Sequence, residues 1–174
     1  MPRWTPDGIK PIFRKSLAGL TTYSFGASDG LDTTNFSSYF IELTDVLPSV
    51  DLDLAVRLSG NTGANYNGVI KYGRTNNTAG AFDAGSTSIQ LTSSTIKASG
   101  LGLSGFMDVM VGTGSGYPRV FFRSFQQDNS VYTYNESGGM LKVTGLITSI
   151  DFLLSGAGTF VGGSLSFYGR RRIS

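Results

Sequence analysis

The regular alternation of large apolar and polar residues constrains this chain more than any other feature. In residues 52–58 every second residue is a large aliphatic one, and most of the residues between them are charged. The same two-residue period recurs in residues 39–44, 149–154 and 164–168. No segment keeps the period of an amphipathic helix, which is about 3.6 residues. A two-residue period is typical of a strand that has one buried face.

Strands without intervening helices predict an all-β fold. We expect a single antiparallel β-sandwich, jelly-roll-like, with about nine or ten strands. The shorter candidate strands are residues 17–25, 69–74, 88–92, 106–112, 119–125 and 140–145. The apolar faces of the clearest strands predict a core that contains Leu54, Val56, Leu58, Ile150, Phe152, Leu154, Leu165 and Phe167.

Glycine supplies the strongest turn signals in the chain, which has 24 glycines in 174 residues. Asn67-Gly68 is the best two-residue hairpin signal, because both residue types tolerate the left-handed backbone of a type I′ turn. Gly138-Gly139 predicts a further turn. A chain of this length fits one domain.

The absence of histidine and cysteine excludes much chemistry. The sequence has no residue of either type. It therefore lacks a thiol nucleophile, a histidine general base, a Ser-His-Asp triad and the usual ligands of structural zinc. We expect no enzyme activity, no catalytic residues, no cofactor and no tightly bound metal.

Three short motifs resemble functional sites but lack their context. Residues 100–105 fit G-x-G-x-x-G, yet the sequence that follows predicts a strand where dinucleotide binding needs a helix. Residues 26–30 fit G-x-S-x-G, but a nucleophile elbow needs a histidine. Asp29 and Asp32 share a predicted loop, where a bound calcium ion stays an alternative to plain surface carboxylates.

Charge is concentrated at the two ends of the chain. Residues 1–15 carry four basic residues and one acidic residue, and the C-terminal end carries three arginines, whereas residues 16–169 are net acidic. Prolines and exposed apolar residues in residues 1–15 predict an extended N-terminal arm outside a sandwich domain of residues 16–174. We expect these ends to bind a partner through Arg3, Trp4, Ile9, Lys10, Ile12, Phe13, Arg14, Lys15, Arg170, Arg171 and Arg172. Solvated tails are the alternative interpretation.

The distribution of charge and apolar residues also limits the partners. No basic stripe with interleaved aromatic residues runs through the body of the chain, so we expect no nucleic-acid partner. No window approaches the roughly 20 apolar residues that span a bilayer, so we expect no membrane partner.

Aromatic residues cluster near the middle of the chain. The cluster contains Phe121, Phe122, Phe125, Tyr132 and Tyr134. We expect these rings in the sandwich core or in an interface. The alternative is a platform on which sugars stack, and the burial of the rings distinguishes the two.

Two stretches of the sequence are familiar. The first is SYFIELTDVLPS at 38–49 with the strand that follows, and the second is ITSIDFLLSGAGTF at 147–160 with GSLSFYG at 163–169. Together they resemble a group of tailed-bacteriophage virion proteins, small β-sandwich domains that occur as head decoration proteins or in tail appendages. The resemblance covers most of residues 37–60 and 147–170, and residues 1–15 have no place in its pattern.

The resemblance implies a non-enzymatic structural role. We expect a capsid decoration or cement protein that assembles as a homotrimer on the major capsid protein or another virion protein. Its location is the virion, after assembly in the host cytoplasm. The alternative is a tail fibre or appendage module that binds host surface glycans. In the first case the three C-terminal guanidinium groups suit carboxylates of a neighbouring subunit.

Overall fold

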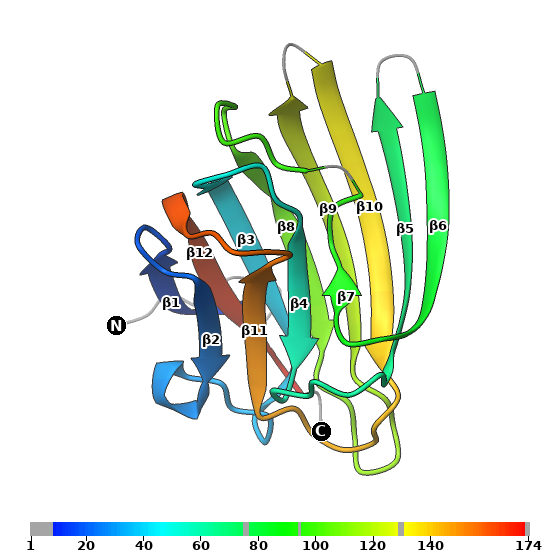
Figure 1. The fold of residues 1–174 in the computed structure, drawn as a ribbon. Helices are drawn as coiled ribbons and strands as arrows, with labels where there is room; N and C mark the ends of the chain where they lie inside the picture. The colour runs from blue at the N-terminus through cyan, green and yellow to red at the C-terminus, as the bar shows by residue number, and fades with distance from the viewer. Residues whose placement is uncertain (1–8, 75–76, 94, 129–130, 173–174) are drawn as a thin grey trace.

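Two antiparallel sheets face each other in this protein (Figure 1). A computed structural model describes residues 9–74, 77–93, 95–128 and 131–172. The eight-stranded sheet has the order β1-β12-β3-β8-β9-β10-β5-β6. Its strands are β1 (Ile9–Ser16), β3 (Phe36–Pro48), β5 (Tyr66–Arg74), β6 (Asn77–Ser86), β8 (Leu103–Met110), β9 (Arg119–Asp128), β10 (Val131–Leu141) and β12 (Phe160–Arg171).

The four-stranded sheet has the order β2-β11-β4-β7. Its strands are β2 (Thr22–Gly26), β4 (Leu54–Leu58), β7 (Ile89–Gln90) and β11 (Ser149–Leu154). Figure 1 shows this smaller sheet in front of one part of the larger sheet, while the β5–β6 hairpin extends beyond it. The all-β sandwich expected from the sequence is therefore confirmed, and one face of the larger sheet is turned away from the second sheet.

The core lies between the sheets, as the alternating pattern predicts. All eight residues predicted for it are buried: Leu54, Val56, Leu58, Ile150, Phe152, Leu154, Leu165 and Phe167. At its centre the Phe167 ring from β12 stacks on the Phe25 ring from β2, with centroids 4.1 Å apart and an interplanar angle of 12°. Phe152 meets Phe167 edge-on at 6.2 Å. These rings join the two sheets directly.

The described part of the predicted N-terminal arm is a strand of the sandwich. β1 pairs antiparallel with β12, from Ile9 opposite Arg170 to Ser16 opposite Ser164. Ile12 and Phe13 pack against the core. The prediction that residues 9–15 lie outside the domain is therefore wrong. Proline breaks a helix but is tolerated in an edge strand, where one side of the backbone needs no partner. Residues 1–8 lie outside the described residues.

Two predicted turns lie inside strands. Asn67-Gly68 is part of β5 and Gly138-Gly139 is part of β10. A Cβ atom at Gly139 would lie 2.6 Å from the Asn67 carbonyl oxygen and 3.0 Å from the side chain of Ile89. Glycine is therefore needed here because a side chain would collide with the backbone of β5 and press on Ile89 of β7, and not because the chain turns.

Strand boundaries also differ from the sequence prediction. β2 begins at Thr22, because residues 17–21 form the connection from β1. The sequence predicted a strand over residues 140–145. The structure has β10 instead, which begins earlier, at Val131, and ends at Leu141. β6 was not predicted, because its small residues give no apolar alternation and Gly80 to Gly85 are exposed.

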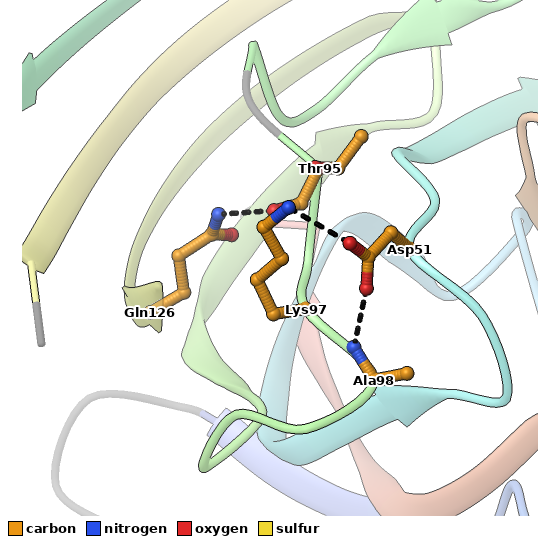
Figure 2. A network of polar contacts seen from close by, with 5 residues as sticks. All are labelled: Asp51, Thr95, Lys97, Ala98 and Gln126. Carbon is orange, nitrogen blue, oxygen red and sulfur yellow. Dashed lines mark hydrogen bonds and ion pairs between the residues drawn. The ribbon is translucent and has the colours of Figure 1, made fainter. Parts of the chain in front are cut away.

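Polar contacts tie residues 95–98, in the loop after β7, to Asp51 and to β9 (Figure 2). The Asp51 carboxylate accepts a 2.8 Å ion-pair hydrogen bond from Lys97 Nζ and a 3.0 Å bond from the Ala98 amide. From β9, Gln126 Nε2 donates to the Thr95 carbonyl oxygen at 3.2 Å. The hydrogen bond from Lys97 is the main reason why the pKa of Asp51 is lowered. These contacts fix the loop over the inner face of β9.

Candidate binding surface

The outer face of the eight-stranded sheet is the candidate site, because its side chains line up in rows across the strands. The pairing register places one residue of every strand in a central row. This row runs Pro11, Tyr168, Phe40, Asp108, Phe121, Gly138, Val69 and Phe82. Most of its members are aromatic or apolar, although the pleat turns them away from the core.

A groove interrupts the central row at Gly138. Because this residue has no side chain, the surface is hollowed between Phe121 on one neighbouring strand and Val69 on the other. The hollow has a volume of about 410 Å³ and a predominantly apolar wall. Its lining consists of Asn67, Gly68, Val69, Phe82, Asp108, Met110, Arg119, Val120, Phe121, Gly138, Gly139 and Met140.

Polar contacts hold one rim of the groove. The Arg123 guanidinium lies over the Phe121 ring, 4.9 Å from its centroid. It also donates to the Glu136 carboxylate, with Nη2 3.0 Å from Oε1. This hydrogen bond raises the pKa of Arg123. Arg123 thus covers one side of the Phe121 ring.

A second group of rings shares the central row on the other side of Asp108. Phe40 lies 5.8 Å from Phe106 and 6.0 Å from Tyr168, measured between ring centroids. The Tyr168 hydroxyl donates to Glu42 Oε2 at 2.9 Å. Burial, followed by this carboxylate, raises the pKa of Tyr168. Because these rings cover one another, less of their surface is accessible than at Phe121.

A corner pocket with three arginines adjoins the groove. Arg119 from β9, Arg170 from β12 and Arg172 line a second hollow, also of about 410 Å³. The surface of this hollow is predominantly apolar, and its other lining residues are Ser37, Ser38, Met110, Gly112, Thr113, Gly116 and Tyr117. No acidic side chain lies among the described residues that line it.

Two of the three predicted C-terminal arginines line the corner pocket and the third does not. Arg170 and Arg172 lie in the corner pocket, and Arg172 is held there by a 3.2 Å hydrogen bond from its Nη2 to the Thr33 carbonyl oxygen. Arg171 is exposed but does not line the pocket. The sequence predicted a positive end, and the fold adds Arg119 from the middle of the chain.

The predicted partner-binding residues of β1 have roles inside the domain. Ile12 and Phe13 pack on the core, which leaves only part of each side chain exposed. Arg14 Nη2 donates to Ser164 Oγ at 3.2 Å, and Lys15 Nζ lies 5.6 Å from the centroid of the Tyr23 ring. The remaining predicted residues of β1, Ile9 and Lys10, are partly buried, while Arg3 and Trp4 lie outside the described residues.

The rings of the predicted aromatic cluster, residues 121–134, are divided between the two faces of the sheet. Phe122 is fully buried, whereas Phe121, Phe125 and Tyr132 are 37%, 64% and 67% exposed. Of these three rings, Phe121 lines the groove, and its exposure fits the sugar-platform interpretation, whereas Phe125 and Tyr132 lie outside the groove lining. The alternation Arg119, Phe121, Arg123, Phe125 was the sequence signal for this surface, since a two-residue period places all four on one face.

The short motifs resolve into turns and strands. The G-x-G-x-x-G segment leads into β8, and the G-x-S-x-G segment forms a short 3₁₀ turn, η1 (Ala27–Asp29). Asp32 accepts hydrogen bonds from the amides of Thr34 and Asn35. Within the described residues, no three acidic side chains gather into a metal site, and no helix has the length and apolarity to cross a membrane.

No family model, curated protein or solved structure matches this chain. Its function is therefore inferred from the fold and from the chemistry of its surface. The outer face offers accessible rings, thioether groups, hydroxyls and guanidinium groups, all of which suit binding.

Proposed function

We propose that this chain is a non-enzymatic virion structural protein that binds host surface glycans as part of a tail fibre or appendage. The sequence resemblance supports the virion assignment. The observation that carries the glycan role is the exposed groove beside Phe121. Head decoration, which the sequence favoured, relied on an arm that leaves the domain, but residues 9–16 form β1.

The chemistry of the groove suits a sugar ring. A pyranose presents a face of C–H groups that packs on an aromatic ring, and hydroxyls at its edge that need hydrogen-bond partners. Phe121 supplies the ring. Asn67, Asp108 and Arg119 supply donors and acceptors around the same hollow. The missing side chain at Gly138 leaves the space that the sugar would fill.

The route of the chain supports a jelly-roll-like domain. From β2 onward each strand of the four-stranded sheet is followed by a strand of the eight-stranded sheet, so the chain crosses repeatedly between the two. Jelly rolls are built from such crossings and occur in viral capsid and lectin domains. We extend the proposal to a homotrimer located in the virion.

Binding to a glycan array tests this function. The purified protein should bind at least one class of bacterial surface glycan, and Phe121→Ala should weaken binding about tenfold, the effect of losing one ring contact. Tyr132→Ala is the matched control, since this exposed ring lies about 20 Å along β10 from Gly138. A folded protein that binds no glycan would contradict the proposal.

Capsid decoration is a second candidate because the groove is itself lined by strongly exposed apolar side chains. Val69 and Phe82 are 57% and 71% exposed, and a connected apolar patch suits a protein partner such as the major capsid protein. Gold-labelled antibody on intact virions distinguishes the two roles. Label on the tail supports the appendage role, and label over the head supports decoration.

A further inference from the structure

Three arginines line the corner pocket, and one of them, Arg119, lies about 50 residues before the other two in the sequence. On the outer face the register runs Arg170, Ser38, Met110, Arg119 across β12, β3, β8 and β9. Adjacent strands are about 4.8 Å apart, so the backbones of Arg119 and Arg170 are separated by about 14 Å. Ser38 and Met110 lie between them, and long guanidinium side chains can reach toward one ligand from either side of this pair.

The charges in this pocket are not balanced from within its wall. Arg172 is anchored by its hydrogen bond to the Thr33 carbonyl oxygen, which is a neutral group. The ion pairs described for this protein, Lys97–Asp51 and Arg123–Glu136, lie elsewhere. Guanidinium groups that line one hollow repel one another, and an anion between them offsets this repulsion. The pocket is therefore suited to a carboxylate, sulfate or phosphate group.

The corner pocket and the groove form one continuous surface. Met110 and Arg119 line both hollows. A ligand that places its anionic group among the arginines can therefore extend past Met110 and lie against Phe121. Beyond Arg119 the groove contains Asp108, the one carboxylate among the described residues that line it.

This pattern of charge favours one class of ligand. A uniform polyanion, such as a nucleic acid or a polyglutamate segment, would bring a second negative group close to Asp108. A saccharide with one acidic group would instead bring neutral hydroxyls close to Asp108. These hydroxyls can donate hydrogen bonds to its carboxylate. Ser38, Thr113 and Tyr117 offer further hydroxyl partners in the corner pocket itself.

We propose that the corner pocket recognises the acidic group of a host saccharide whose neutral part lies in the groove. This inference rests on the proposed glycan-binding function and names its ligand class. It assigns Arg119, Arg170 and Arg172 to the acidic group. Phe121 is assigned to the sugar ring next to it.

Paired acidic and neutral saccharides test the inference. The probes are a disaccharide with one uronic acid residue, a sialylated trisaccharide and a singly phosphorylated oligosaccharide, each titrated beside its ester or unsubstituted counterpart by calorimetry. At least one acidic member should bind about tenfold or more tightly than its counterpart, and Arg170→Gln should remove that difference. Raising the salt concentration should weaken only the acidic ligand.

Variants separate this inference from the proposed function. Arg14→Gln is the matched control, because Arg14 is an exposed arginine of the same sheet outside the pocket, and it should leave binding unchanged. Equal binding of acidic and neutral saccharides that Phe121→Ala weakens would overturn the inference but preserve the proposed function. Equal or tighter binding of single-stranded DNA or polyglutamate would also overturn the inference. Failure to bind any saccharide would overturn both.

Discussion

The stacked rings at the centre of the sandwich give the sharpest test of the fold. Phe167 is 1% exposed and contacts rings of Tyr23, Phe25 and Phe152 from the opposite sheet. Phe167→Ala removes a buried aromatic side chain, which costs about 3–5 kcal/mol of unfolding free energy. The three ring contacts place the expected loss at the upper end of this range. For a chain of this length the midpoint of thermal unfolding should fall by about 6–20 °C.

Urea unfolding followed by far-ultraviolet circular dichroism measures this loss. The slope of the free energy against urea should stay constant, because the same surface is exposed on unfolding. Phe167→Leu keeps much of the volume and should cost about 1–2 kcal/mol, so that a folded variant is available if Phe167→Ala does not fold. Phe82→Ala is the control, since this ring is exposed and should change stability by less than about 0.5 kcal/mol. Equal losses at Phe167 and Phe82 would refute the packing of the two sheets through Phe167.

Four further changes test other parts of the structure. Deletion of residues 1–16 should lower the thermal midpoint or prevent folding. The reason is that β12 loses one of its two neighbouring strands, β1, and the core loses the apolar side chains that β1 packs on it. A truncated chain as stable as the full one would restore the arm interpretation. Gly139→Val should destabilise the protein by about 1–3 kcal/mol, measured by urea unfolding, because its side chain would collide with Ile89. Asp53→Asn should raise the thermal midpoint near pH 7 and not near pH 3, because burial raises the pKa of Asp53 and so penalises only its charged form. Asp51→Asn should lower the midpoint near pH 7, because the hydrogen bond from Lys97 stabilises the charged carboxylate and lowers the pKa of Asp51 in the folded protein. The difference from the wild type should shrink once the pH falls below the ordinary pKa of 3.8, and it should vanish below the lowered pKa of the folded protein.

Local pattern determined the strands that have one buried and one polar face. In β4, β11 and the C-terminal half of β12 large apolar residues recur at every second position, so their inward side could be named from the sequence. The reason is physical: a strand buried on one face needs apolar residues at every second position and tolerates polar ones between them. The absence of histidine and cysteine likewise constrained the chemistry, because no arrangement of the chain can supply a side chain that its composition lacks.

Tertiary structure decided which segments become edges and where glycine is needed. β1 contains a proline and three basic residues, a composition that fits both a free arm and a protected edge strand. Only its pairing with β12 distinguishes them. In β10 a glycine pair has the composition of a turn, but at Gly139 the close approach of the β5 backbone and of Ile89 from the other sheet requires glycine. Such contacts join residues far apart in the sequence, so local propensity carries no record of them.

The candidate site depended most on tertiary structure. The alternation in residues 119–125 could show that Arg119 and Phe121 share a face, but not what lies beside them. Their neighbours come from β3, β8, β10 and β12, and the register of the sheet sets which side chains meet. A shift of one residue in any of these pairings would turn that strand's outward side chains toward the core. The arginine pocket and the groove therefore exist only because long-range strand pairing fixes this register.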